Sequence, residues 1–289
     1  MKEYLVILAG SPRGGEATWN SLYKYVIDYL DADLAICCSN KWDTNISLFK
    51  KAKYIWTFEE MDDYSDYYKN NFSGNWREYF DLGVDEDGVE TGLYTSGSIH
   101  FVFKDFIRKN YLDLVTNYKN IIYTRFDQYY VDYHPKITTD QIYIPEGEDY
   151  FGICDRHAAF PSKYTNQFLN ICGYIDNPKS LLTNRSYINC ETTFKDHMVY
   201  EGLNSKIKRY PRSQFTASLQ GEHTNWRVAK YRIYFKKDLM TKYPGEFMNS
   251  LNNLINESTF FKALIKESVL TLNYLYLKSR IWLGKFKNL

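Results

Sequence analysis

The sequence predicts an α/β fold: a Rossmann-like mixed sheet flanked by helices, with a helical extension at the C-terminus. Three observations support this prediction. The chain opens with the order strand, glycine-rich turn, helix, strand over residues 4–37. Two later apolar runs end in charged residues, which is where α/β proteins place their ligand sites. Finally, apolar residues recur at helical spacing over residues 246–283.

The first strand is expected at residues 4–9, because YLVILA is a short and wholly apolar run. The sequence GSPRGG at residues 10–15 follows as a turn, and Thr18 is a candidate N-cap for the next helix. A second strand is expected at residues 34–37. This order of elements favours a parallel sheet with ligands at the carboxyl ends of its strands.

Residues 58–92 are rich in Asp, Glu, Tyr and Gly and include the acidic run DEDG at residues 85–88. We expect an irregular surface insertion there, and the spacing of the acidic residues does not match an EF-hand loop. A helix is predicted over residues 99–115, where aromatic and aliphatic residues return every three or four positions. A second helix is predicted over residues 190–200.

Charged residues follow two further apolar runs. A strand predicted at residues 120–124 leads into Arg125, Phe126 and Asp127. A strand predicted at residues 150–154 leads into a second group of ionisable side chains, which consists of Asp155, Arg156 and His157. Because charge at the end of a buried strand is typical of α/β active sites, both groups are candidates for chemistry.

The composition indicates a globular protein of the cytoplasm. The 289 residues are 44% hydrophobic and 25% charged, which is ordinary for a folded domain, although 18% are aromatic. The five cysteines form no CxxC pair, so we expect neither a zinc site nor a disulfide framework and favour a reducing compartment. No apolar stretch is long enough for a signal peptide core or a membrane span.

The net charge of +1 hides an asymmetry along the chain. Residues 227–289 carry 12 basic and 4 acidic side chains, a net charge of +8, whereas residues 1–226 have a net charge of −7. We therefore divide the chain into a nucleotide-binding domain at residues 1–226 and a basic helical extension at residues 227–289. The extension, with Trp282 among basic residues, is a candidate for peripheral contact with an anionic membrane or a partner; a solvated basic face is the alternative.

The turn at residues 10–15 suits a phosphate group. Its three glycines let backbone amides approach an anion, the following helix offers its positive end, and Arg13 supplies a planar guanidinium. It is no Walker loop, because no Gly-Lys-Ser/Thr closes it. Further along, Asp127 could hold a divalent cation, and Arg125 could neutralise phosphate or orient Asp127.

The second ionisable group suits acid–base chemistry. Asp155 or His157 could act as a general base, with Arg156 tuning the charge. Glu191 and His197 lie on the helix predicted at residues 190–200, but their separation of six residues does not place two ligands on one helix face. Each of these groups also has a structural interpretation, as a salt bridge at a strand end or as a buried histidine.

Taken together, these elements resemble GT-A-type glycosyltransferases of surface-polysaccharide and lipopolysaccharide synthesis, including related viral enzymes. The resemblance covers residues 3–215 and rests on four segments in order: strand with G-S-P-R-G, I-I-Y-T-R-F-D-Q-Y-Y, D-R-H-A-A-F-P-S and C-E-T-T-F-K-D-H-M-V-Y-E-G-L. It implies a GT-A fold and transfer of a sugar from a nucleotide-sugar donor, such as a UDP- or GDP-sugar, to a glycan acceptor.

The resemblance also implies roles for individual residues. Gly10, Pro12 and Arg13 match the donor-nucleotide loop, and Arg125 and Asp127 stand where the family carries its metal-binding D-x-D motif, although this chain has Arg-Phe-Asp. From the residues and the resemblance together we expect the following site. Donor binding is assigned to Gly10, Pro12, Arg13, Arg125 and Arg156, catalysis to Asp155, His157 and Glu191, and binding of Mn²⁺ or Mg²⁺ to Asp127 and His197. No nucleic-acid partner is expected.

Two other functions remain open at this point. A sulfotransferase is one, since the glycine-rich turn followed by Thr18 and Trp19 superficially echoes the phosphate loop of that class, although the turn lacks the expected Ser/Thr spacing and no clear second phosphate element occurs beyond residues 209–213. A non-catalytic carbohydrate-binding protein is the other, favoured by the Tyr and Trp content. Such a protein would have no need of the glycine-arginine turn.

Overall fold

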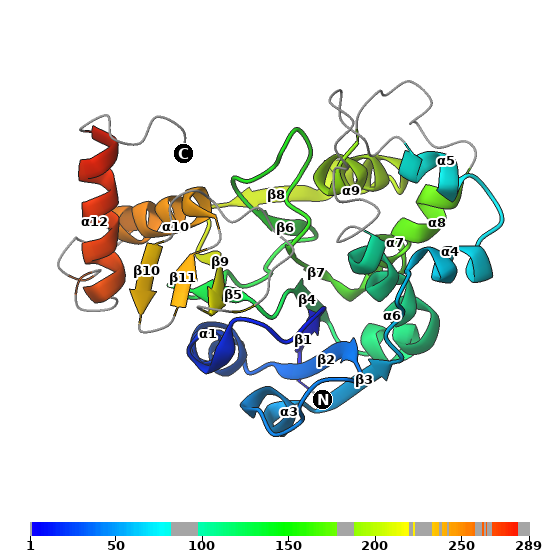
Figure 1. Ribbon diagram of the computed structural model, residues 1–289, viewed down its shortest axis with the longest axis horizontal. Coiled ribbons are helices and arrows are strands. Elements are labelled where there is room, and N and C mark those ends of the chain that lie inside the picture. The colour runs from blue at the N-terminus through cyan, green and yellow to red at the C-terminus, as the bar shows by residue number, and fades with distance from the viewer. Residues whose placement is uncertain are drawn as a thin grey trace.

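The computed structural model describes residues 2–81, 98–177, 188–219, 222, 233–236, 239–241, 243–257, 262, 264 and 268–282. Within these residues the chain forms an α/β fold with a seven-stranded mixed sheet, flanked by helices, and a second sheet of four strands. The large sheet runs through the middle of the molecule, and the second sheet lies to one side with the last helices (Figure 1). The predicted α/β class, with a mixed sheet flanked by helices, is confirmed.

One half of the large sheet is parallel. It consists of β3 (Tyr54–Phe58), β2 (Asp33–Ser39), β1 (Tyr4–Ala9) and β4 (Asn120–Thr124), in that spatial order. Leu5 and Ile7 of β1 face one hydrophobic core, while Val6 and Leu8 face the other, as the two-residue period of a strand requires. Burial on both faces explains why β1 is a continuous apolar run.

The other half contains antiparallel pairs. β7 (His157–Pro161) runs antiparallel to β4, β6 (Ile142–Pro145) runs antiparallel to β7, and β8 (Ile207–Tyr210) closes the edge parallel to β6. The strand predicted at residues 150–154 is wrong, because Tyr150 and Phe151 adopt left-handed backbone conformations that end any extended run. The strand begins instead at His157, after the charged group.

One face of the large sheet is covered by α6 (Ser98–Thr116), which confirms the predicted helix at residues 99–115. The same core is lined by further helices, which are α7 (Thr165–Leu169), α8 (Ile171–Asp176) and α9 (Cys190–Tyr200). α9 coincides with the predicted helix, and Asn189 and Thr192 form a capping box at its start. Two 3₁₀ turns flank these elements, η3 (Ser162–Tyr164) and η4 (Asn204–Lys206).

The opposite face carries α1 (Gly15–Leu22), which continues through the π-helical turn η1 (Tyr23–Ile27) into α2 (Asp28–Leu30). The short helix α3 (Ser47–Lys51) packs in the same core. The prediction of Thr18 as an N-cap is wrong, because α1 already begins at Gly15. Thr18 is fully buried inside the helix.

The aromatic residues of the predicted insertion are structural where they are described. Residues 65–81 contain two helices, α4 (Ser65–Asn71) and α5 (Trp76–Asp81). Tyr68 is completely buried, with its ring centroid 5.5 Å from that of Trp76 and 4.9 Å from that of Phe80. The expectation of an irregular surface segment is therefore wrong for this part, and the acidic run at residues 85–88 lies outside the described residues.

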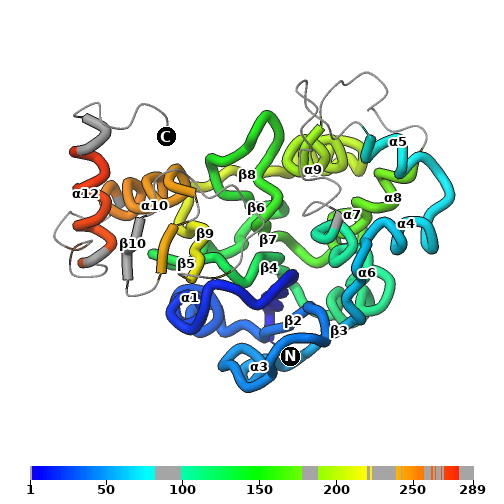
Figure 2. The backbone as a smooth tube through the Cα atoms, viewed as in Figure 1, coloured from blue at the N-terminus to red at the C-terminus, as the bar shows by residue number. Residues whose placement is uncertain are grey.

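The second sheet joins distant parts of the chain. Its order is β10 (Ile233–Lys236), β11 (Leu239–Thr241), β9 (Gln214–Leu219) and β5 (Gln128–Tyr130). α10 (Pro244–Glu257) and α12 (Ser268–Trp282) follow it and form a joint core with β5 and β9 (Figure 2). Helices in the predicted C-terminal extension are thus present, and strands on both sides of the predicted boundary at residue 226 pair with each other.

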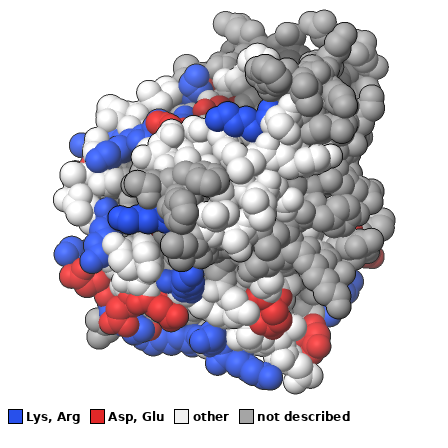
Figure 3. All heavy atoms as spheres, turned by 90° about the vertical axis from the view of Figure 1, so that its left-hand side faces the viewer, with Lys and Arg blue, Asp and Glu red and all other residues white. Residues whose placement is uncertain are grey.

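Figure 3 views the side formed by the second sheet and the last helices, where described basic and acidic side chains lie near each other. Of the residues that suggest a basic surface, Lys278 is exposed on α12, whereas Arg280, Trp282, Lys285 and Lys287 have side chains outside the described part, so membrane contact there stays a prediction. Among the described residues, none of the helices combines the length and the apolar character needed to cross a bilayer.

Candidate active site

The glycine-rich turn follows β1 in a conformation that only glycine adopts readily. Gly10, Gly14 and Gly15 have φ angles of 124°, 93° and 72°. The Gly10 amide donates to the Cys37 carbonyl at 3.0 Å, and the Arg13 carbonyl accepts from the indole N–H of Trp19 at 3.1 Å. The turn is therefore held at both ends, with Pro12 buried and Gly10 and Arg13 half-buried.

This turn meets the end of β4. A Cβ atom added to Gly14 would lie 3.2 Å from the Cα of Asp127, so the two backbones touch. The Gly14 amide donates to the Glu222 carboxylate at 3.3 Å, which shows that an anionic oxygen fits at this amide. The structure thus brings the predicted phosphate turn and the predicted carboxylate together.

Arg125 and Asp127 form a two-pronged ion pair. The Arg125 Nε donates to Asp127 Oδ1 at 3.0 Å and its Nη2 to Oδ2 at 2.6 Å. Asp127 is only 3% exposed. Burial opposes the charge on Arg125, but the Asp127 carboxylate raises the pKa of the guanidinium above its ordinary value. The guanidinium therefore stays charged in a mostly buried position.

Arg156 is the centre of a second charge network. Its Nη1 donates to Glu191 Oε1 at 2.7 Å, and its Nη2 lies 3.3 Å from Glu246 Oε1. The guanidinium carbon lies 5.1 Å from the centroid of the Tyr243 ring. Arg125 and Arg156 influence each other's charge, and Tyr243 interacts electrostatically with both. The predicted residues Arg125, Asp127, Arg156 and Glu191 thus belong to one connected region.

Glu246 anchors this network from the first turn of α10. It is completely buried, and its Oε1 also accepts from Arg212 Nη1 at 3.0 Å while its Oε2 accepts from the Thr216 amide at 2.7 Å. Burial alone raises the pKa of a carboxyl, but the charges of Arg212 and Arg156 lower the pKa of Glu246. The carboxylate thereby joins α10 to β9 and to both arginines.

Sequence reasoning missed Glu246, Arg212 and Tyr243. Arg212 lies within residues 209–213, for which the sequence suggests only a phosphate contact. Tyr243 and Glu246 flank Pro244-Gly245 at the start of a helix, and an acidic residue in that first turn is a common stabilising feature that by itself signals no site. Glu246 stands on the face of α10 that is buried, but the sequence does not reveal its partners, because Arg156 and Arg212 lie far away in the chain.

Glu191 is the candidate with the most useful ionisation behaviour. Burial and the nearby charge of Asp155 raise the pKa of Glu191 to about 7, against the opposing charge of Arg156. Asp155 is 5% exposed. A carboxyl group whose pKa lies near neutrality can accept or donate a proton at physiological pH, which is the property required of a general base.

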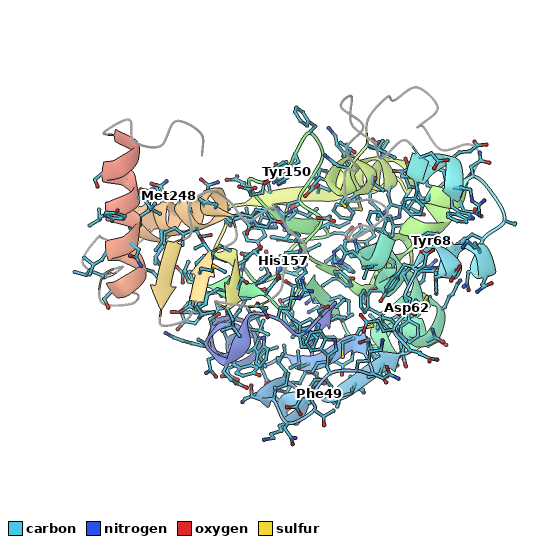
Figure 4. All side chains as sticks on the ribbon, in the orientation of Figure 1. Phe49, Asp62, Tyr68, Tyr150, His157 and Met248 are labelled. Atoms are coloured by element: carbon cyan, nitrogen blue, oxygen red, sulfur yellow. The ribbon has the colours of Figure 1, made fainter. Side chains whose placement is uncertain are left out.

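His157 lies in the core, next to a second histidine. It is 1% exposed, its Nε2 is 2.9 Å from His134 Nε2, and its Nδ1 is 3.4 Å from the Tyr130 hydroxyl. Burial and the neighbouring His134 lower the pKa of His157 well below its ordinary value. Figure 4 shows it near the middle of the molecule. The histidine is therefore neutral and engaged with protein partners on both ring nitrogens.

His197 and Lys104 lie together in the core under α6 and α9. His197 is fully buried, and burial together with the charge of Lys104 lowers its pKa to about 3. No group of three or more His, Cys, Asp and Glu side chains able to hold a metal ion occurs in the described part of the chain. Within that part, Asp127 and His197 do not belong to such a ligand set.

Lys104 is an unexpected buried cation. It is completely buried, and its Nζ lies 5.4, 4.9 and 4.5 Å from the ring centroids of Tyr123, Phe168 and Phe194. Among the described residues its Nζ has no hydrogen-bond partner. Burial lowers the pKa of Lys104 to about 8, although Asp155 acts in the opposite direction.

No protein-family model matches the chain, and no curated protein matches its sequence. Its function therefore has to follow from its own residues and their geometry.

We predict that Glu246→Gln lowers the free energy of unfolding by about 3 kcal/mol, because Arg156 and Arg212 lose the charge that compensates them in the interior. Urea denaturation at pH 7 measures this.

Since the pKa of Glu246 is depressed in the folded state, the stabilisation is present above the ordinary Glu pKa and is lost as the pH falls through the folded value. The exposed Glu78→Gln, in the first turn of α5, is the control and should change stability by less than about 0.5 kcal/mol. Equal behaviour of the two variants would contradict a central role for Glu246.

Lys104→Met should instead stabilise the protein by about 1–3 kcal/mol, because it removes a buried charge and keeps the packed volume. A folded pKa of about 8 lies below that of an unfolded lysine, so the penalty is complete below pH 8 and disappears as the pH rises towards the unfolded value. The gain should shrink over that interval in denaturation curves. Lys109→Met on the same helix removes an ammonium that is paired with Asp105 at 2.9 Å and should not stabilise. Destabilisation by Lys104→Met would mean that the ammonium is better compensated than its surroundings indicate.

Proposed function

We propose that this chain is a GT-A-type glycosyltransferase that moves a sugar from a nucleotide-sugar donor to a glycan acceptor at the cytoplasmic side of a cell. The observation that carries the proposal is the position of two loops relative to the strand order. β2 and β3 extend the sheet to one side of β1, whereas β4 lies on the other side. In open α/β sheets, ligands bind at this point of reversal, outside the carboxyl ends of the strands.

The two segments that leave this point carry the expected chemistry. Residues 10–15 follow β1, and Arg125 and Asp127 follow β4. Backbone amides of a glycine turn at the start of a helix, together with fixed guanidinium groups, suit the diphosphate of a nucleotide sugar. Arg125 and Arg156 are positioned to stabilise the negative charge that develops on the diphosphate as it leaves. Asp127 orients Arg125 through its two hydrogen bonds.

Glu191 supplies the base in this proposal. Its near-neutral pKa allows it to accept the proton from the acceptor hydroxyl as that oxygen attacks the anomeric carbon. The contact between Arg156 and Glu191 connects the leaving-group side of the site to the base. Asp155 raises the basicity of Glu191 through its negative charge.

A protein-held divalent cation fits these residues poorly. Both carboxylate oxygens of Asp127 accept from Arg125, so a cation bound by this carboxylate would have to displace the guanidinium. We therefore derive no step through a metal ion and assign the neutralisation of the diphosphate to the arginines.

The experiment that tests this proposal is a thermal-shift series with UDP-, GDP- and CMP-sugars and a sulfonucleotide, each with EDTA or with Mn²⁺. We expect one class of nucleotide sugar to stabilise the protein, since a ligand at 100 times its Kd adds about 2.7 kcal/mol. Arg125→Lys should weaken that donor roughly tenfold, because lysine cannot reproduce the two-pronged geometry. EDTA should leave the shift unchanged.

Arg108→Lys is the matched control, since Arg108 makes a similar paired contact with a buried Asp105 but lies on α6 away from both loops. It should leave donor affinity unaltered. Stabilisation by the sulfonucleotide alone would favour the sulfotransferase alternative. Absence of any nucleotide effect would leave a carbohydrate-binding protein as the better hypothesis.

A second prediction concerns pH. A base must be deprotonated to act, so the transfer rate should rise with pH through about 7, the pKa of Glu191. Glu191→Gln should reduce the rate at least about 100-fold and remove this ascending limb. Glu201→Gln, at the other end of α9, should preserve both the rate and its pH dependence. A variant at Glu191 that keeps the ascending limb would assign the base to another residue.

A further inference from the structure

The loop between β6 and β7 holds an unusual backbone. Gly147 has a φ of 82°, and three residues with side chains follow it in the left-handed region: Glu148 at 55°, Tyr150 at 39° and Phe151 at 67°. Side chains disfavour this region, so such conformations persist only where surrounding contacts determine them, and they concentrate at binding and active sites.

Several hydrogen bonds hold this loop in place. The Asp149 carboxylate accepts from Arg209 Nη2 at 2.9 and 3.0 Å and from the Cys154 amide at 2.9 Å. Asn189, the N-cap of α9, donates to the Tyr150 carbonyl at 3.0 Å. The loop is therefore attached to β8 and to the helix that carries Glu191.

The loop also touches the proposed catalytic residues directly. Arg156 Nη2 donates to the Glu148 carbonyl at 3.2 Å. A Cβ atom on Gly152 would lie 2.0 Å from the backbone of Glu191, so only glycine fits there, and the Ile153 amide donates to the Glu191 carbonyl at 3.1 Å. Gly152 therefore packs against the backbone of Glu191, the proposed base, and Phe151 is the residue directly before it.

This fixed loop presents aromatic rings to solvent. Phe151 is 91% exposed and Tyr150 is 46% exposed, and the Tyr150 ring centroid lies 6.0 Å from the Arg156 guanidinium. Figure 4 shows Tyr150 in the upper part of the molecule, between the positions of α10 and α9 in Figure 1. Tyr150 and Phe151 are neighbours in the chain, so their exposed rings together give this loop an apolar surface beside Arg156.

We propose that Tyr150 and Phe151 form the acceptor subsite, in which their rings stack on a sugar whose hydroxyl faces Glu191. This inference rests on the proposed function and deepens it by assigning acceptor recognition to one loop. Aromatic faces suit the C–H surface of a pyranose, and the exposed Glu146 beside them offers a carboxylate to sugar hydroxyls, whereas the carboxylates of Glu148 and Asp149 are bonded to Tyr150 and Arg209. The same carboxylates oppose contact with an anionic membrane, which is the other partner that an exposed Phe suggests.

Saturation-transfer NMR tests this subsite by measuring the binding of methyl glycosides of glucose, galactose, mannose and N-acetylglucosamine. No nucleotide-sugar donor is present in the sample. Wild-type protein should bind at least one of them, and Phe151→Ala should weaken that binding roughly tenfold. Phe151→Trp should restore it. Tyr276→Ala, which removes a 58% exposed ring from α12, is the control and should have no effect. Because Phe151 is almost fully exposed, none of its variants should alter the unfolding midpoint.

Equal binding by wild type and Phe151→Ala, or no binding to wild type, would overturn the subsite. Sedimentation with vesicles of phosphatidylcholine and phosphatidylserine tests the alternative that the loop binds a membrane. Vesicle binding by the wild type that is lost in Phe151→Ala would support this alternative and contradict the acceptor subsite. Glycoside binding needs no donor, whereas the thermal shift with nucleotide sugars needs no acceptor. The glycoside experiment can therefore fail while the nucleotide-sugar experiment succeeds, and the reverse, so the two proposals are tested separately.

Discussion

The interior of this protein depends on one buried carboxylate. Glu246 accepts from Arg212 and the Thr216 amide and forms an ion pair with Arg156, so it joins three distant parts of the chain. Without it, two guanidinium groups would remain in the interior with too little negative charge around them. Because Arg156 also holds Glu191 and the carbonyl of Glu148, the same carboxylate positions the proposed base and the aromatic loop. Stability and the geometry of the site thus share a single set of contacts.

The C-terminal segment is therefore part of the same structural unit as the charge network and is not a separate appendage. Residues beyond 226 contribute β11 to the second sheet and supply Tyr243 and Glu246 to the charge network around Arg156. A segment with a high positive net charge therefore places its essential acidic residue in the interior. The positive net charge of this segment conceals the carboxylate by which it joins the interior.

Local patterns in the sequence were sufficient for much of the fold and for part of the candidate site. The apolar runs at residues 4–9 and 120–124 coincide with β1 and β4, and the approach of the glycine turn to Asp127 follows from neighbouring parallel strands. The strand predicted at residues 150–154 failed because left-handed φ angles at Tyr150 and Phe151 leave no trace in hydrophobic pattern. Glu246 escaped notice because its partners lie 34 and 30 residues away, at Arg212 and Thr216. Charge pairing over such separations is decided by packing, not by local spacing.

In the proposed function, the turn after β1 and the Arg125–Asp127 pair after β4 surround one diphosphate. Crystals grown with the nucleoside diphosphate that stabilises the protein most would test it directly. We expect phosphate oxygens within hydrogen-bond distance of amides in residues 10–15 and of the Arg125 guanidinium. A diphosphate bound elsewhere on the molecule, with both loops unaltered, would contradict the claim.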